Sequence, residues 1–338
     1  PVVQAKVKGK KVVTLASNLS EQTASFSTNP AFCLLDYLRN ERYGKGLATS
    51  SLDLQSFYDA SQICETQVTP YGSASNINIF DCNAVIDTSK KVIDNVREIV
   101  KGMRGYLPFV QGKYRLNIET TGTASVSLSE DDIIGGYALA SPSKNSKYNR
   151  VLVSFVNPER NYQVDEIQYP AIDDSGYATA DKHATMKSVD GGFLLEGRFD
   201  FRTITSPYQA EEMAEIILRR SREALGLNLN VGFKAYELHV GDLVNISISS
   251  LGFSNKTFRV LSMTFNEDYT IGLSCVEYQA SHYTWASKAQ VSSTPATNLP
   301  NPFSIQAPAG LTLTDEMIEY ADGVVLTRLN ILITASSD

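Results

Sequence analysis

The chain has 338 residues, of which 43% are hydrophobic and 20% charged, a composition that describes a globular protein and excludes a wholly disordered one. Its 30 basic and 37 acidic residues give a net charge of −7, which argues against sequence-independent DNA binding over the outer surface, since such binding needs a basic face. No apolar run approaches the roughly 18 residues of a membrane span, and the N-terminus is not a signal peptide.

The first predicted element is a hairpin in residues 1–28. Apolar and charged positions partly alternate there around a turn at Gly9–Lys10. Because an isolated hairpin is only marginally stable in water, its partner strands must lie elsewhere. Pro1 is not an initiator Met, so we expect the chain to begin partway through a longer protein.

A helix with both ends marked is predicted after Asn29. The Asn29 side chain can accept a hydrogen bond from the first turn, and Pro30 fits the first helical position, where its missing N–H costs nothing. Apolar residues then recur at spacings of three and four through Leu38, which predicts one buried side. Gly44 and Gly46 supply the left-handed backbone that a helix end and its loop need.

Residues 53–86 are predicted to form a second helix and a strand. Asp53 can cap a helix over residues 54–65, which carries apolar residues at helical spacing. The mostly apolar stretch over residues 77–86 then predicts a strand.

The strongest amphipathic helix is predicted after Asp87 and Thr88, which can cap it. Its apolar residues form a continuous stripe, and Gly105 lies where a helix-terminating glycine belongs. The chain then returns as a hairpin with its turn at residues 111–113. Strand, helix and hairpin together predict a compact α+β unit.

The next part of the chain is rich in Ser, Thr, Asp and Gly, and short β elements are predicted in it. Ser129 and Asp132 have the spacing of a capping box, but the glycine pair that follows allows at most one turn. Residues 148–162 alternate in polarity and predict a strand that ends at Asn157–Pro158. The polar stretch 170–190 shows no sustained period and predicts a long loop.

A long helix is predicted after Ser206–Pro207, again a cap followed by proline. Its acids come early and its basic residues late, which complements the helix dipole. These residues are Glu211, Glu212, Glu215, Arg219, Arg220 and Arg222. The arginine cluster could bind phosphate or nucleic acid, but a solvated face is the better interpretation because acids flank it.

Residues 228–285 are predicted to form a run of antiparallel strands, hence a small barrel or sandwich, with a turn at Ser254–Lys256. Residues 286–304 contain three prolines and no period, which predicts a semi-rigid linker. Residues 305–338 look like the first strands of a fibronectin type III sandwich, which about 34 residues cannot complete. We therefore expect more protein to follow.

No arrangement typical of a catalytic or metal centre is found in the sequence. Motifs for nucleophilic serine, zinc and phosphate sites are absent, and the polar loop matches no known metal-ligand spacing. Paired catalytic carboxylates, as in glycosidases, need not be neighbours in the sequence, so the sequence leaves this alternative open. The residues considered are Asp173, Asp174, Asp181, His183, His239 and His282. We predict no catalytic, cofactor-binding or metal-binding residue.

The four cysteines are scattered without a C-x-x-C pair. This favours buried free thiols over disulfides or a metal site and fits folding in a reducing cytoplasm. They are Cys33, Cys64, Cys82 and Cys275.

Four stretches closely resemble, in the same order, segments of the tail tip (host-specificity) proteins of long-tailed phages, the lambda tip attachment type. The first is residues 29–47, NPAFCLLDYLRNERYGKGL. The second is the helix and glycine-turn hairpin of residues 82–118. The third is Asn-Arg-Val with the following alternation and Asn-Pro in residues 148–162, and the fourth is the Ser-Pro start of the helix with Gln-Ala-Glu-Glu. The likeness spans residues 29–285.

The resemblance implies a non-enzymatic structural protein of the virion tail tip, assembled in the host cytoplasm. A homotrimeric hub of this kind closes the distal end of the tail tube and opens for DNA ejection. A trimer can end a six-fold tail tube only if each of its subunits offers two tube-like surfaces. The implied partners are other tail tip and distal tail proteins, the tape measure protein in the lumen, a host receptor bound by regions beyond this chain, and DNA only in transit. The alternatives are a tail-associated cell-wall hydrolase and a cell-surface adhesin with fibronectin modules.

The expected fold class is α+β, β-rich and multidomain, with tail-tube-like β-barrel hub domains, an α+β domain and a truncated fibronectin type III sandwich. The length suggests about two to four folded domains. The expected parts are strands completing an N-terminal hub barrel (1–28), a helical connector (29–74), an α+β hub domain (75–119), a β hub region with a long loop (120–200), a tail-tube-like β domain with one helix (201–285), a linker (286–304) and the start of a fibronectin type III domain (305–338).

Overall fold

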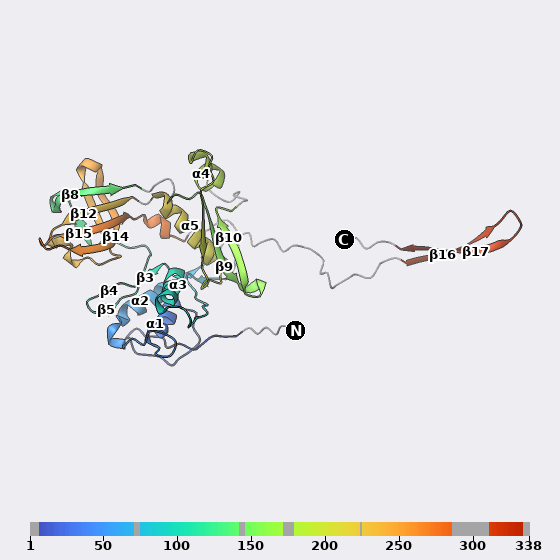
Figure 1. The fold of residues 1–338 in the computed structure, drawn as a ribbon, viewed down its shortest axis with the longest axis horizontal. Coiled ribbons are helices and arrows are strands. Elements are labelled where there is room, and N and C mark those ends of the chain that lie inside the picture. Colours follow the sequence, from blue (N-terminus) through green and yellow to red (C-terminus); the bar gives the residue numbers. More distant parts are fainter. Residues whose placement is uncertain are drawn as a thin grey trace. The chain divides into compact units, whose positions relative to one another are not determined.

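The computed structural model describes residues 7–70, 75–141, 146–171, 179–223, 225–285 and 311–333. The chain divides into two compact units, Pro1–Ser292 and Ser293–Asp338. The expected linker and two acids of the polar loop, Asp173 and Asp174, lie outside the described residues. The helices are α1 (Pro30–Arg39), α2 (Leu54–Cys64), α3 (Val92–Gly102), α4 (His183–Val189) and α5 (Pro207–Glu223) (Figure 1).

The N-terminal segment is an arm with two isolated bridges. Val12 pairs with Ser25 and Leu15 with Glu21. The chain reverses near Leu19, whose φ is 63°. No turn forms at Gly9–Lys10, and the first strand of the predicted hairpin lies outside the described residues. Val12 and Leu15 are buried, because they reach the core formed by the helices.

Helix α1 begins as predicted. The Asn29 side-chain oxygen accepts a hydrogen bond from Ala31 N at 3.0 Å. The helix ends at Arg39, because Asn40 adopts extended backbone, and so it stops before the two glycines thought to terminate it. Gly44 is needed for a different reason, since a Cβ there would lie 1.7 Å from a carbonyl oxygen of the helix.

Replacing Asn29 with alanine should lower the free energy of unfolding by about 2 kcal/mol. The buried Asn29 amide also donates to Ser61 O at 3.0 Å and to Glu65 Oε1 at 2.8 Å, so it joins α1 to α2. Alanine therefore removes a cap and leaves acceptors unpaired. Urea unfolding would measure the loss, with Asn18→Ala as control because Asn18 is exposed and bonds only its own turn. Equal losses in both variants would contradict this role.

Helix α2 follows Asp53 as predicted, although the Asp53 side chain makes no capping hydrogen bond. Helix α3 starts after Lys91, so neither predicted cap is used, and Asp87 instead accepts from Ser89 N at 2.9 Å in a turn. The left-handed residue after α3 is Arg104, with φ 54°, and not the predicted glycine.

Short strand pairs surround these helices. The predicted strand over residues 77–86 shrinks to two residues, but the hairpin at residues 111–113 is confirmed, with Gln111 and Gly112 at φ 50° and 79° as its twist requires. The pairs are β1 (Gln67–Val68) with β2 (Ile77–Asn78), β3 (Gly105–Tyr106) with β6 (Asn117–Ile118), and β4 (Phe109–Val110) with β5 (Lys113–Tyr114).

A three-stranded sheet is centred on β9 (Arg150–Asn157), the strand predicted from alternation. It pairs antiparallel with β10 (Gln163–Tyr169) and parallel with β11 (Glu196–Asp200), and α5 packs on it. Between β10 and β11 the predicted loop contains α4. That helix buries only Met186, so it carries no apolar stripe that a sequence pattern could reveal.

The second sheet has six strands and is curled. Its outer strands, β7 and β8, are connected by residues 129–132 alone. Laid flat, they would be about 24 Å apart, but such a connection spans at most about 18 Å, so the sheet must curl. Its strands, in spatial order, are β7 (Val126–Leu128), β13 (Leu243–Ile248), β14 (Phe253–Phe265), β15 (Ile271–Glu277), β12 (Gly226–Val231) and β8 (Ile133–Ala140).

The small antiparallel barrel or sandwich that was predicted is an open, curled sheet, because β7 and β8 do not pair with each other in the described chain. The capping box of Ser129 and Asp132 is confirmed and forms one turn between them. The turn predicted at Ser254–Lys256 is wrong, since those residues lie within β14 and the reversal occurs at Ser249–Leu251. Residues 233–237 form a 3-10 helix where a strand was expected.

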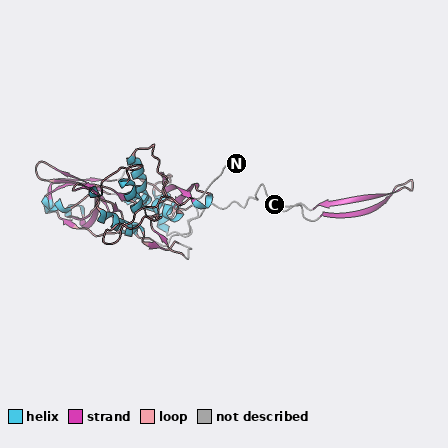
Figure 2. Cartoon of the chain, turned by 90° about the horizontal axis from the view of Figure 1, so that it is seen from below, coloured by secondary structure: helices cyan, strands magenta, loops and turns pink. Residues whose placement is uncertain are grey.

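Two large cores hold the first unit together, with a small third cluster of Ile216, Leu243, Tyr278 and Tyr283. Buried side chains from Val12 to Leu218 form one, which α1, α2, α3, β9 and α5 share. The inner face of the curled sheet forms the other. In the second unit, β16 (Leu311–Glu319) and β17 (Val325–Ile333) form a long antiparallel hairpin (Figure 2). Within the described ranges no third strand joins them, so the fibronectin type III expectation is not confirmed.

None of the helices described is both long and apolar enough to cross a membrane.

Candidate functional site

Helix α5 lies between the two sheets of the first unit and packs against β9 and β10 (Figure 1). The face predicted to be solvated is only partly so: the side chains of Arg219, Arg220 and Arg222 are 29%, 41% and 20% exposed, whereas the acids are buried. Glu211, Glu212 and Glu215 are 3%, 2% and 8% exposed, and no residue from Pro207 to Arg222 is fully exposed. Helix propensity and dipole order are local properties, whereas burial on every side comes from the elements packed around the helix.

The α5 arginines bind carboxylates that come from different parts of the chain. Arg220 Nη1 donates to Glu119 at 2.7 Å, and Arg222 Nη1 donates to Asp190 at 2.8 Å. The Arg222 hydrogen bond holds the pKa of Asp190 below its usual value. The third, Arg219, pairs with its helix neighbour Glu215 and with Asp181. These arginines are structural, and the phosphate-site interpretation finds no support.

A fully buried ion pair joins α5 to the end of α3. Arg104 Nη1 lies 3.5 Å from Glu212 Oε1, and the two side chains are 3% and 2% exposed. The Arg104 guanidinium also lies over the rings of Phe80 and Tyr283, at 4.8 and 5.5 Å from their centroids. Burial lowers the pKa of Arg104, and the Glu212 carboxylate opposes this shift. No sequence pattern links these residues, which lie far apart in the chain.

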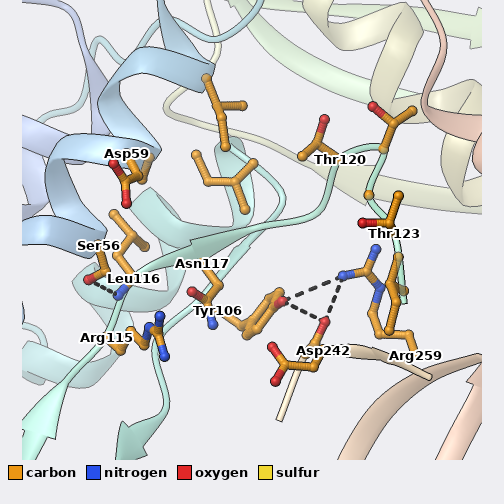
Figure 3. A pocket seen from close by; sticks show the side chains of 17 residues that line it. Ser56, Asp59, Tyr106, Arg115, Leu116, Asn117, Thr120, Thr123, Asp242 and Arg259 are labelled. Atoms are coloured by element: carbon orange, nitrogen blue, oxygen red, sulfur yellow. Dashed lines mark hydrogen bonds between the residues drawn. The ribbon is translucent and has the colours of Figure 1, made fainter. Parts of the chain in front are cut away.

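A cavity of about 240 Å³ opens between α2, the β3–β6 segment and the curled sheet. Figure 3 shows Tyr106 and Arg259 facing each other across one end of it. Tyr106 Oη donates to Gly241 O at 3.1 Å, and Arg259 Nη1 donates to the same carbonyl at 3.0 Å. Asp242 and Asp59 lie elsewhere on its wall. Sequence reasoning missed this cavity, because its polar residues share no motif or spacing.

Strand β8 has one edge without a strand partner in the described chain. Its other edge pairs with β12. Its sequence, IIGGYALA, contains no charge and no proline, and every residue after Ile133 is exposed. Uncharged edges of this length invite pairing with another chain. The Gly135–Gly136 pair, at φ 82° and 146°, limits the regular part of the edge to Tyr137–Ala140.

An aromatic cluster lies at the same end of the sheet as the start of β8. Phe233 and Tyr236 stack with centroids 4.7 Å apart, and Tyr236 meets Phe265 edge-on at 6.1 Å. All three are more than half exposed, at 72%, 57% and 63%. The register places Phe265 beside Ile271, Ile271 beside Val231 and Val231 beside Ile133. We call β8 and this cluster together the apolar edge.

The residues considered for metal or catalytic roles do not converge. His183 lies in α4, His282 is buried in a 3-10 helix, and His239 Nδ1 lies 3.5 Å from Asp242. Asp181 is engaged by Arg219. Over the described ranges, no group of three or more His, Cys, Asp or Glu could hold a metal ion.

The cysteines are free thiols, as predicted. Burial raises the pKa of Cys275 to about 12 and also raises that of Cys64. These two thiols are therefore poor nucleophiles at neutral pH.

The relatives that the comparisons find are phage tail proteins. It matches no protein-family model. It is 25% identical to the baseplate hub protein pb3 of Escherichia phage T5 over 293 residues, 82% of this chain and 30% of that protein. It is 26% identical to the tip attachment protein J of Escherichia phage SECphi27 over 145 residues, 42% of this chain and 12% of that protein. The chain thus spans less than a third of the length of either relative.

A solved structure of a native gene transfer agent virion contains a chain that resembles this one with a TM-score of 0.44 and 12% identity, covering 59% of this chain and 42% of that chain. The likeness to phage tail tip proteins that the sequence motifs indicated is confirmed: the homologues of this chain are a baseplate hub protein and a tip attachment protein of phage tails.

Proposed function

We propose that this protein is a structural hub subunit of a phage tail tip, and that three copies form a ring that closes the distal end of the tail tube. The apolar edge carries this proposal. A free, uncharged strand edge beside exposed aromatic rings is unfavourable in a monomer and favourable when a neighbouring subunit covers it. The similarity to a baseplate hub protein over most of the chain supports the same role.

The ring would work through shape and not through chemistry. In the proposal each subunit offers tube-like surfaces to the tail tube, so that a trimer matches a six-fold tube. Distal tail proteins and the tape measure protein are the proposed partners, and parts of the protein outside this chain would bind the receptor. The ring would open to let DNA pass into the host. We propose assembly in the host cytoplasm and residence in the virion tail tip.

Replacing Leu139 with lysine should prevent ring formation. Leu139 is 42% exposed on the apolar edge, so lysine can reach solvent in the monomer but would be buried under a neighbour. Light scattering should give about three times the chain mass of 37.1 kDa for the unchanged protein and a monomer for L139K. Circular dichroism checks that the variant folds.

The matched control is Val189→Lys, which places the same charge on α4 at a position that is 74% exposed and outside the apolar edge. V189K should still form trimers. A monomeric hub in images of intact tails, or trimers of L139K as stable as those of V189K, would rule out the proposed ring.

A further inference from the structure

Two of the four free thiols, those of Cys33 and Cys82, lie against each other beside the start of α1. Their side chains hydrogen-bond to one another, although the residues lie far apart in the sequence. Both are anchored to the same short stretch of backbone, since Cys33 Sγ donates to Ser27 O at 3.7 Å and Cys82 N donates to Thr28 O at 2.7 Å. Thr28 Oγ1 also donates to Asp81, the neighbour of Cys82, at 2.7 Å. The main chain thus holds the two sulfur atoms side by side, which is the first requirement for a bond between them.

The thiols of the chain differ in their exposure to solvent. Cys33 is partly exposed. Cys82, Cys64 and Cys275 are 6%, 0% and 1% exposed. A small oxidant in solution therefore meets Cys33 first, and Cys82 is the thiol in hydrogen-bond contact with it.

The two thiols of the pair also differ in acidity. The hydrogen bond from the Cys82 thiol lowers the pKa of Cys33. Burial and the carboxylates of Asp36 and Asp81 oppose this shift without cancelling it. The same hydrogen bond, together with burial, raises the pKa of Cys82 well above its usual value. Cys33 is thus the thiol that ionises first, and the thiolate is the form that attacks an oxidant.

We propose that Cys33 and Cys82 form a peroxide-sensitive thiol pair, which closes to a disulfide and thereby stabilises the contact between α1 and the segment that follows β2. The Cys33 thiolate attacks one oxygen of hydrogen peroxide, the O–O bond breaks, and Cys33 becomes a sulfenic acid. The hydroxide that is released takes up a proton and leaves as water. The Cys82 sulfur then attacks Cys33 Sγ, and the hydroxyl group leaves with the Cys82 proton as a second water. Two thiols are oxidised, and one peroxide is reduced to two waters.

The disulfide would close the loop between residues 33 and 82, which contains α2. Closing a loop of this length stabilises a fold mainly by restricting the unfolded chain. In a reducing compartment the two thiols would stay free, so the bond would form only after the protein meets an oxidant. This inference depends on the two thiols and is independent of the proposed ring.

Mass spectrometry of the full chain treated with hydrogen peroxide tests the pair. After treatment, the protein is unfolded in iodoacetamide to block the remaining thiols and is digested without reductant. We expect two peptides joined through Cys33 and Cys82, with Cys64 and Cys275 alkylated. No joined peptides, or a bond between Cys33 and Cys64, would overturn the proposal.

Cys82→Ala removes the second thiol of the pair. The sulfenic acid at Cys33 then has no thiol to attack it and should be oxidised further to sulfinic acid, which mass spectrometry detects. The matched control is Cys275→Ala, in the core of the curled sheet, which should still form the disulfide. Circular dichroism checks that both variants fold. Equal amounts of sulfinic acid at Cys33 in the unchanged chain and in C82A would contradict the role of Cys82.

Cys33→Ser tests the effect of the disulfide on stability. Peroxide should raise the melting temperature of the unchanged chain by about 5 °C or more, and dithiothreitol should reverse the rise. C33S keeps a donor for Ser27 O, so it should fold but show no rise. A rise in C33S equal to that of the unchanged chain, or a disulfide-bonded chain that melts no higher than the reduced one, would overturn the proposal.

Discussion

Replacing Glu212 with glutamine should lower the free energy of unfolding by about 3 kcal/mol or more. The change keeps the shape of the side chain but leaves the charge of Arg104 buried and without its partner carboxylate. Because α3, α5 and the ring of Tyr283 all meet at this guanidinium, the loss should appear as one cooperative shift of the unfolding midpoint. Chemical unfolding followed by circular dichroism measures it.

The matched control is Asp200→Asn, which breaks an exposed ion pair with Arg202 and should change stability little. A double variant, Arg104→Met with Glu212→Leu, should recover most of the lost stability, because apolar side chains of similar size can replace a buried ion pair. If E212Q lowers the free energy of unfolding no more than D200N does, the Arg104–Glu212 ion pair does not join α3 to α5 in the way that its burial indicates.

Replacing Gly241 with alanine should cost about 3 kcal/mol, the second largest effect that we expect. Gly241 has φ 98°, which side chains other than glycine rarely adopt, and a Cβ there would lie 2.0 Å from the Tyr106 ring. Both the helical part and the curled sheet contribute to this contact, so either the ring or the loop must move. Thermal unfolding of the full chain would report the loss.

Gly252→Ala separates the two causes. Gly252 also has a left-handed backbone, with φ 69°, but a Cβ there meets nothing within 4 Å. The variant should therefore show only the backbone term, about 1 to 2 kcal/mol. Tyr106→Ala should relieve part of the damage in G241A. Equal losses in G241A and G252A would show that the Tyr106 contact is unimportant.

The elements that the sequence predicted well are those whose signals are local. The Asn29 cap, the Ser129 capping box, the alternation of β9 and the glycine hairpin at residues 111–113 depend on residues a few positions apart. The free thiols and the likeness to phage tail tip proteins were also readable, because residue spacing and motif order survive without coordinates.

Other predictions were wrong, because the structure at those positions depends on residues outside the local pattern. Asp87 does not cap α3 as predicted, because its carboxylate accepts a hydrogen bond from Ser89 N in a turn that precedes the helix. The short helix α4 has a single buried residue, Met186, so it has no periodic pattern to detect. The predicted barrel stayed open because strand pairing between its edges is a long-range property that alternation cannot specify.

By itself, the sequence determined where helices α1, α2, α3 and α5 and strand β9 lie, that the cysteines are unpaired, and which class of phage protein the chain resembles. Only the tertiary structure decided that the acids of α5 are buried, that Arg104 meets Glu212, and that Arg259 faces a cavity. The physical reason is distance along the chain. Helix caps and strand alternation act over a few residues, whereas the burial of a charge depends on all the elements that fold around it.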